Sequence, residues 1–426
     1  MVLLPRSTPD RLLGPTALSP LTPSSVRGNP TPPISDDPLL IPRPDLKVGA
    51  RISYFLPQWE EVTSDTWVLG VVARGLPITF HQQPPLASRP IFERPPVDPE
   101  KCLALRQEVQ AMLEKGAIQE LPKDDRSPGF YSRIFLVRKK SGKWRPVIDL
   151  SILNTWIVSP HFKMVTPRTV ISTVQPGQWA ASIDLTDACF HIPILKRDRK
   201  FLRFTFDGKV YQFRVLPFGI TTAPLVFTKV LQVVGSYLHR RGIDILIYFD
   251  DSLVLSYSRD QCAEDTRAAL ATLIRLGFIP SGEKSELIPS QDFIFLGYRF
   301  RTDLGLVLPP EEKFCKTLEL IYQFLRSDQV TARWYLRLLG YLNCIADVIP
   351  LGRLHIRPLQ AHLLSAWSPA SKDWETPVIL DTSVKQYARW WTLKDNVLQG
   401  TPLKSPSPER TLYTDASLSG WAGFLD

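Results

Sequence analysis

Cysteines and long apolar runs are scarce in this sequence. The five cysteines are scattered and form no Cys-x-x-Cys pair, which argues against a disulfide framework and against a four-cysteine zinc site. No stretch reaches the roughly 18 consecutive apolar residues of a membrane span, and Pro5, Arg6 and Asp10 interrupt the apolar start that a secretory signal needs. We therefore expect an intracellular protein of the cytoplasm, the nucleus or both, with no membrane partner.

Several common catalytic motifs are also missing. The sequence contains no P-loop, no Gly-rich dinucleotide fingerprint, no His-Glu-x-x-His and no Gly-x-Ser-x-Gly. A P-loop ATPase, a Rossmann dehydrogenase, a zinc protease and an α/β-hydrolase therefore have no local support.

Positive charge, by contrast, is in excess. Lys and Arg number 51 against 42 Asp and Glu, which gives a net charge of +9 at pH 7 and a pI near 9.3. This balance favours a polyanionic partner, with nucleic acid ahead of a membrane surface. Hydrophobic residues make up 44% of the chain, enough to build cores in two or three domains.

Composition divides the 426 residues into segments. Residues 1–46 hold 11 of the 39 prolines, which predicts a disordered leader because proline supports neither helices nor sheet ladders. Residues 47–97 combine an aromatic stretch with a second Pro-rich stretch, which indicates a small packed accessory segment and a linker. Strand and helix patterns alternate from 98 to 300, and mainly helical patterns follow from 301 to 405. We expect an α+β fold.

Local patterns predict individual elements. Amphipathic spacing and terminal glycines or prolines mark the helices, and alternating apolar residues bounded by turn residues mark the strands. The predicted helices are 99–116, 221–242, 259–277, 309–328, 331–347 and 381–396. The predicted strands are a hairpin over 132–150, then 180–185, 200–206, 209–216, 243–249 and 252–258.

Three acids lie where strands are predicted to end. Asp250 and Asp251 stand between two apolar strands of a predicted hairpin, although Asp is common in turns and the pair alone is a weak signal. At roughly 4 Å and an effective dielectric near 20, two carboxylates repel by about 4 kcal/mol, a cost that a divalent cation would remove. If the strand that ends at Asp184 is adjacent, three carboxylates converge with the oxygen ligands that Mg²⁺ prefers.

Several segments occur in the order found in reverse transcriptases. They resemble motifs A to E of that family and, upstream, its fingers hairpin. The resemblance implies a right-hand polymerase with fingers, an antiparallel palm sheet and a helical thumb and connection. The segments are Val137–Asp149 for the hairpin, then Ser182–Ile194, Leu216–Leu231, Tyr248–Asp251, Gly277–Leu287 and Phe295–Phe300.

The resemblance also implies an activity. Reverse transcriptases are RNA-directed DNA polymerases, which add deoxynucleoside triphosphates to a primer 3′-hydroxyl on an RNA or DNA template. The family's ligands for two Mg²⁺ ions, with Mn²⁺ as an alternative, match Asp184, Asp250 and Asp251. Lys284 matches the lysine proposed as proton donor to pyrophosphate. The implied nucleotide-binding residues are Lys139, Arg145, Asp187, Ala188, Cys189, Phe218 and Gly219.

The chain departs from the family pattern at two positions. Cys189 stands where an aromatic ring usually blocks a ribose 2′-hydroxyl, which puts ribonucleotide discrimination in doubt unless Phe190 supplies the wall. Ser151 stands where the fingers motif often has Arg, so one template contact is in doubt. His191 matches a residue that serves packing, and we assign it no catalysis.

Other features point to a branch of the family. The form of motif B and a Trp-containing segment near residues 49–69 resemble the polymerases of DIRS-type retrotransposons. Leu412–Gly423 resembles the first strands of an RNase H domain, in which Asp415 would be the first metal-binding acid. Because the chain stops at Asp426, we expect residues 409–426 to be a truncated start that does not cut RNA.

Alternatives remain open at this point. The chain could be an inactive or domesticated element that binds nucleic acid without polymerising. It could be a fragment of a polyprotein whose ribonuclease H activity comes from missing C-terminal sequence. An RNA-templated RNA polymerase is a weaker alternative.

Overall fold

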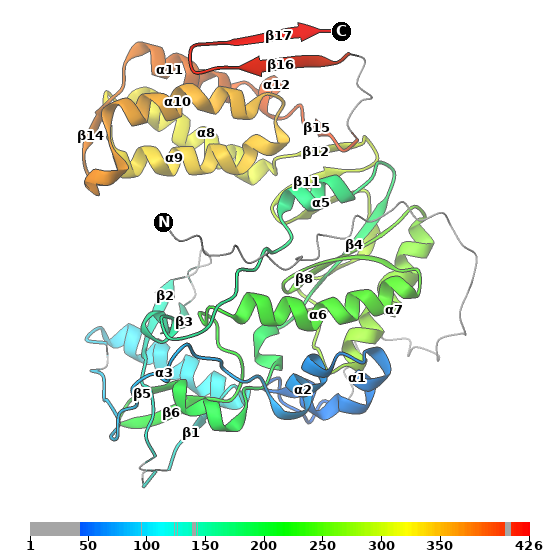
Figure 1. Cartoon of the computed structure of the whole chain (residues 1–426), viewed down its shortest axis with the longest axis vertical. Coiled ribbons are helices and arrows are strands. Elements are labelled where there is room, and N and C mark those ends of the chain that lie inside the picture. The colour runs from blue at the N-terminus through cyan, green and yellow to red at the C-terminus, as the bar shows by residue number, and fades with distance from the viewer. Residues whose placement is uncertain are drawn as a thin grey trace, which may run out of the picture. The chain divides into compact units, whose positions relative to one another are not determined.

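The computed structural model describes residues 43–94, 96–122, 124–125, 127–138, 142, 144–404 and 410–426. Of the predicted leader, only residues 43–46 belong to this part of the chain, and Lys139 lies outside it. The described residues form helices together with antiparallel sheets, as the predicted α+β class requires (Figure 1).

An antiparallel sheet carries the three acids. Its four strands pair in the order β7-β8-β4-β9, and α6 and α7 pack against them. Both helices end before a glycine of positive φ, at Gly242 and Gly277, where the sequence places their ends. The elements are β4 (Trp179–Asp184), β7 (Asp244–Tyr248), β8 (Asp251–Ser256), β9 (Glu286–Ser290), α6 (Ala223–Arg240) and α7 (Arg259–Arg275).

A three-stranded sheet and a separate hairpin are distinct from the sheet that carries the acids. Some of their strands precede that sheet in the chain, and the others lie between two of its strands. The predicted strand over 200–206 is wrong in its first part, because 196–201 form a 3-10 helix and only the later residues extend. The Asp207-Gly208 turn has two positive φ values, as a tight hairpin of this type requires. The elements are α3 (Pro99–Glu114), β1 (Ile118–Glu120), β2 (Arg133–Arg138), β3 (Trp144–Asp149), β5 (Arg203–Phe206) and β6 (Lys209–Phe213).

The N-terminal helices share the main hydrophobic core. A 3-10 helix, Arg51–Phe55, leads into α1 (Leu56–Val62), and α2 (Thr66–Arg74) follows. Trp59 has 0% exposure, its ring packs edge-on against Phe278, and its indole N–H donates to the Leu276 carbonyl at 3.0 Å. The segment is therefore built into the body that carries the acidic sheet.

The C-terminal helices form a second core around Phe324, Tyr335 and Trp391. Sequence patterns predict most of them and miss α10, which contains Pro358. The last predicted helix, 381–396, is not continuous. A short helix, a 3-10 turn and α12 form this segment instead. The helices are α8 (Glu311–Arg326), α9 (Ala332–Ile345), α10 (Gly352–Ala366), α11 (Thr382–Arg389) and α12 (Lys394–Val397).

Small sheets and short helices complete the described chain. The hairpin β16–β17 is exposed along its whole length. No helix in the described part of the chain combines the length and the apolar character that a membrane crossing demands. The elements are α4 (Ser151–Asn154), α5 (Pro167–Thr173), β10 (Asp292–Phe295), β11 (Tyr298–Arg301), β12 (Leu306–Leu308), β13 (Gln329–Thr331), β14 (Pro377–Ile379), β15 (Thr401–Pro402), β16 (Leu412–Ala416) and β17 (Trp421–Leu425).

Candidate active site

A two-residue turn sets the tip of the acidic hairpin. Tyr248 pairs with Asp251 across β7 and β8, which leaves Phe249 and Asp250 as the turn. Phe249 has φ +55°, a left-handed conformation that costs a residue with a side chain roughly 1–2 kcal/mol. Its ring packs against Phe227 of α6 at 5.0 Å between centroids, and this contact holds the strained turn in place.

The sheet register brings the three acids together. Asp184, the last residue of β4, lies directly opposite Asp251, the first residue of β8. The Leu185 N–H donates to the Asp250 carbonyl at 3.2 Å, which fixes the turn against the end of β4. The adjacency of the two strands, on which the sequence argument depends, is therefore present.

Burial and mutual repulsion perturb the acids. Burial, followed by the charges of Asp250 and Asp184, raises the pKa of Asp251 to about 6. Burial and the neighbouring Asp184 carboxylate also raise the pKa of Asp250. Carboxylates perturbed by partial burial and by like charge are typical of functional sites.

Lys284 faces these acids from the loop between α7 and β9. Its ammonium lies 3.1 Å from one carboxylate oxygen of Asp184 and 3.4 Å from the other. The loop is tied to the same residue, because the Asp184 N–H donates to the Ser285 hydroxyl and the Ser281 N–H donates to the Asp184 carbonyl. The Lys284 side chain is 66% exposed, whereas that of Asp184 is 14% exposed.

The three carboxylates fit the chemistry of Mg²⁺, which prefers oxygen ligands. Within the described ranges, however, no three His, Cys, Asp or Glu side chains are arranged so that they could hold a metal ion by themselves. Lys284 balances the charge of Asp184 in this arrangement. Mg²⁺ is commonly bound by one or two carboxylates together with substrate phosphates, so the donor set suits an ion that arrives with a phosphate ligand.

The loop after β4 forms a tight turn beside the acids. Asp187 adopts φ +48° and precedes a 3-10 helix, Ala188–His191. Its carboxylate pairs with Lys115 at 2.8 Å. Sequence reasoning missed Lys115, and no local signal could have found it because the two residues are far apart in the chain.

Aromatic rings lie next to Cys189 in the chain and in space. Cys189 has 0% exposure, and burial, aided by the Asp250 charge, raises the pKa of its thiol to about 12. The next residue, Phe190, packs against Phe218 with 5.7 Å between ring centroids, and Phe218 is 51% exposed. The accessible surface here is therefore aromatic and comes from Phe218, with Phe190 supporting it.

Gly219 is needed for its backbone conformation. Its φ is +96°, and an added Cβ would meet only the Ile148 carbonyl oxygen at an ordinary 3.5 Å. The Asn154 side chain fixes the loop, since its amide donates to the Gly219 carbonyl and its oxygen accepts from the Thr221 N–H.

His191 has a structural role in the described contacts. One ring nitrogen, Nδ1, bonds the Ala188 carbonyl at 3.1 Å, so Nε2 is the acceptor for the Ile279 N–H at 3.1 Å. Burial lowers the pKa of His191 to about 4, which keeps the ring neutral. The ring thus joins the loop after β4 to the segment that leads to Lys284.

The remaining predicted residues that the structure describes lie on hairpins or directly after one. Arg145 is exposed on β3, opposite Val137, while Lys139 lies outside the described residues. Ser151 is the first residue of α4, directly after β3, and its N–H and hydroxyl donate to the Asp149 carboxylate at 3.0 and 2.6 Å. Asp415 is exposed on β16, and no other predicted site residue lies on that hairpin.

Comparison with a protein family gives a match over part of the chain. Residues 137–300 match the family described as "Reverse transcriptase (RNA-dependent DNA polymerase)". The matched region contains all three acids, Lys284 and the predicted nucleotide-binding residues.

Viral polyproteins resemble a larger part of the chain. The Gag-Pol polyprotein of Walleye dermal sarcoma virus is 30% identical over 338 residues, which cover 78% of this chain and 18% of the polyprotein. The enzymatic polyprotein of Soybean chlorotic mottle virus is 25% identical over 363 residues, covering 82% of this chain and 48% of the polyprotein. The chain thus spans less than half of either relative.

Solved structures share the fold. The foamy viral protease-reverse transcriptase dRH in complex with double-stranded DNA superposes with a TM-score of 0.64 at 19% identity, over 91% of this chain and 70% of that chain. The foamy viral protease-reverse transcriptase in complex with an RNA/DNA hybrid gives a TM-score of 0.60 at 19% identity, over 83% of this chain and 46% of that chain. The fold is that of a right-hand polymerase.

Proposed function

We propose that this chain is an RNA-directed DNA polymerase of a retroelement, because residues 137–300 match the reverse transcriptase family. The observation that carries the proposal is the convergence of three acids, Asp184, Asp250 and Asp251, at one end of the antiparallel sheet. A sheet end that concentrates negative charge at a strained turn gains little stability from it, which favours a role in binding cations and phosphates.

In this proposal Asp184 and Asp250 are the main ligands for a pair of Mg²⁺ ions, or Mn²⁺, and Asp251 is the more peripheral third acid. A bound pair of such ions lowers the pKa of an attacking hydroxyl and stabilises charge on a transferring phosphate. The protein's part is positional. The β4–β8 register holds two carboxylates opposite each other, and the Phe249–Phe227 contact fixes the third.

Lys284 has a separate role in the proposal. Its ammonium neutralises Asp184 while no other cation is present, and its exposed side chain leaves it free to turn toward a bound triphosphate. From there it would give a proton to the departing pyrophosphate, as a general acid. The hydrogen bonds of Asp184 to Ser281 and Ser285 keep the loop that carries Lys284 beside the acids.

The incoming deoxynucleoside triphosphate is proposed to lie between the acids and the fingers hairpin. Lys139 and Arg145 would contact its phosphates, and the turn at Asp187 and Ala188 would offer backbone N–H groups. Phe218 and Gly219 would pack against the base. Since Cys189 is fully buried, the aromatic surface of Phe218, supported by Phe190, is proposed to take over the exclusion of ribonucleotides.

RNA and DNA template-primers are the proposed partners. The net charge of +9 favours a polyanion, and two solved structures of the same fold hold double-stranded DNA and an RNA/DNA hybrid. Affinity that comes from Lys and Arg neutralising phosphates falls steeply with salt concentration.

We also propose a finer placement within the family. The motif B form and the segment at 49–69 support a DIRS-type retrotransposon origin. The β16–β17 hairpin supports an RNase H-like start, with Asp415 as its first acid. Ribonuclease H activity would need further acids from additional sequence.

Primer extension tests the proposed activity. Wild-type protein, an RNA template with a DNA primer, four deoxynucleotides and Mg²⁺ should give extended primers, and Asp250→Asn should lower the rate by about 10²-fold or more, which is over 2.7 kcal/mol of transition-state stabilisation. Asp244→Asn is the matched control, because Asp244 lies at the opposite end of the same hairpin. Its rate should stay near wild type.

The same experiment distinguishes a polymerase from the main alternative, an inactive protein that binds nucleic acid. Salt-dependent binding of primer-template without any extension by the wild type would favour a remnant that binds nucleic acid. Equal rates for wild type and Asp250→Asn would show that the Asp250 carboxylate does not contribute to the reaction, which would contradict the proposed mechanism.

A further inference from the structure

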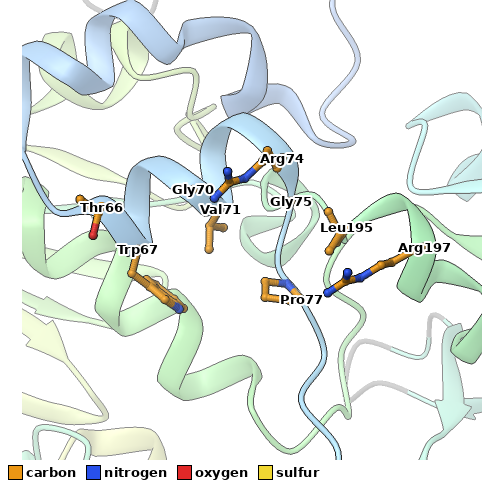
Figure 2. Close-up of a pocket in the computed structure, with 9 residues that line it drawn as sticks. All are labelled: Thr66, Trp67, Gly70, Val71, Arg74, Gly75, Pro77, Leu195 and Arg197. Carbon is orange, nitrogen blue, oxygen red and sulfur yellow. The ribbon is translucent and has the colours of Figure 1, made fainter. Parts of the chain in front are cut away.

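A cleft lies between α2 and the start of the 3-10 helix over 196–201, and it contains none of the proposed catalytic residues. Its volume is about 400 Å³. Sites for small ligands commonly measure about 300–1,000 Å³, so a ligand of nucleotide size fits. Figure 2 shows Trp67, Pro77 and Arg197 bordering one opening, with Arg74 above it.

Backbone contacts hold the two walls of the cleft together. The Leu76 N–H donates to the Pro193 carbonyl at 2.8 Å, and the Leu195 N–H donates to the Leu76 carbonyl at 2.9 Å. Gly75 has φ +96°, and a Cβ there would lie 2.6 Å from the Leu195 nitrogen. Because only glycine allows this approach, the cleft is preformed by the backbone.

The lining of the cleft combines positive charge with one aromatic ring. Arg74 and Arg197 are exposed, and no lining residue is acidic. Among the described residues Arg74 forms no ion pair, and Arg197 has only a 3.6 Å contact with Asp198. Lys229 of α6 does not line the cleft, but its ammonium lies over the Trp67 ring, 4.1 Å from the ring centre. A ligand that suits this lining carries negative charge and a flat apolar surface.

We propose that this cleft binds one nucleotide unit of a single-stranded nucleic acid. Proteins that hold single strands combine a cationic groove with an aromatic side chain on which a base stacks. Arg74 and Arg197 suit phosphate oxygens, since a guanidinium can donate two parallel hydrogen bonds to them. A duplex keeps its bases stacked inside and cannot present one to Trp67. The proposal rests on the proposed function, because a polymerase must handle the unpaired part of its template.

Binding measurements with and without an unpaired strand test the proposal. Fluorescence anisotropy would compare a blunt duplex with the same duplex carrying a single-stranded template extension. The cleft variant is Arg74→Gln/Arg197→Gln, and the control is Arg259→Gln/Arg267→Gln, which removes the same charge from two exposed positions of α7. The cleft variant should bind the extended substrate about tenfold more weakly than the control does, with equal binding of the blunt duplex.

Salt dependence gives a second readout. Loss of two phosphate contacts on a single strand should reduce the slope of log affinity against log salt by about 1.4 relative to the control. Equal affinities and equal slopes for the cleft and control variants would overturn the proposal. A photoreactive bromouracil in the extension should also crosslink to the peptide that contains Trp67, and crosslinks confined to other peptides would overturn it.

Two further arms identify the source of the ligand. Free deoxyadenosine monophosphate is added to both complexes. If it abolishes the additional affinity that the extension gives while the blunt duplex stays bound, the cleft binds a free nucleotide, and the assignment to a strand is overturned. A phosphopeptide that does so would assign the cleft to a protein partner. Primer extension by the wild type is run in parallel. Extension with no cleft effect refutes this inference alone, whereas a wild type that neither binds nor extends primer-template refutes the proposed function.

Discussion

Protonation of His191 should destabilise the protein below neutral pH. The ring is buried and neutral, its Nε2 accepts the Ile279 N–H, and its pKa of about 4 lies below the ordinary value of 6.5. The unfolded chain therefore binds a proton at a higher pH than the folded chain does. The stability that this group contributes is fully present above pH 6.5 and is lost as the pH falls toward 4.

The expected size follows from these two values. Between pH 7 and pH 5 the unfolded state gains about 0.7 of a proton at this position, while the folded state stays nearly neutral. The free energy of unfolding should fall by about 2 kcal/mol over this interval on account of His191. Urea unfolding monitored by circular dichroism would measure it at both pH values.

A substitution isolates the contribution of this ring. Gln at position 191 can donate to the Ala188 carbonyl and accept from Ile279, but it does not titrate. His191→Gln should therefore lose about 2 kcal/mol less stability than wild type between pH 7 and pH 5. An equal loss in both proteins would refute the reasoning.

Three further substitutions test other parts of the account. Trp59→Ala should lower the free energy of unfolding by about 3–5 kcal/mol in urea titrations, because it empties a fully buried site, and a loss under about 1 kcal/mol would contradict that packing. Gly75→Ala should destabilise more than Gly142→Ala, since both have positive φ but only the first would clash, and equal losses in the same titrations would argue against the preformed wall. Phe190→Ala should increase ribonucleotide incorporation in primer extension more than Cys189→Ala does, and the reverse order would return the discriminating role to Cys189.

The sequence is informative where local patterns decide the structure. An acidic pair between two apolar strands predicts a hairpin tip, and the hairpin is there with Asp250 in its turn. Glycines at 242 and 277 predict the ends of two helices, because positive φ favours glycine. The order of the motifs then predicts the fold, which likeness to solved structures confirms.

Long-range contacts and local exceptions limit such reasoning. The Lys115–Asp187 ion pair and the Ile279–His191 hydrogen bond join residues far apart in the chain. Proline usually ends a helix, so sequence patterns do not predict α10, which contains Pro358 in its interior. The roles of the individual site residues remain predictions, because register can place carboxylates together without showing what they bind.

Template-directed synthesis is the central claim, and omission of one deoxynucleotide tests it most directly. With a primer on an RNA template of known sequence, Mg²⁺ and three of the four deoxynucleotides, the wild type should extend the primer up to the first position that needs the missing one and stop there. Restoring the fourth should give full-length product, and Asp184→Asn should give neither product. Extension past the stop, or the same products from Asp184→Asn, would contradict the account.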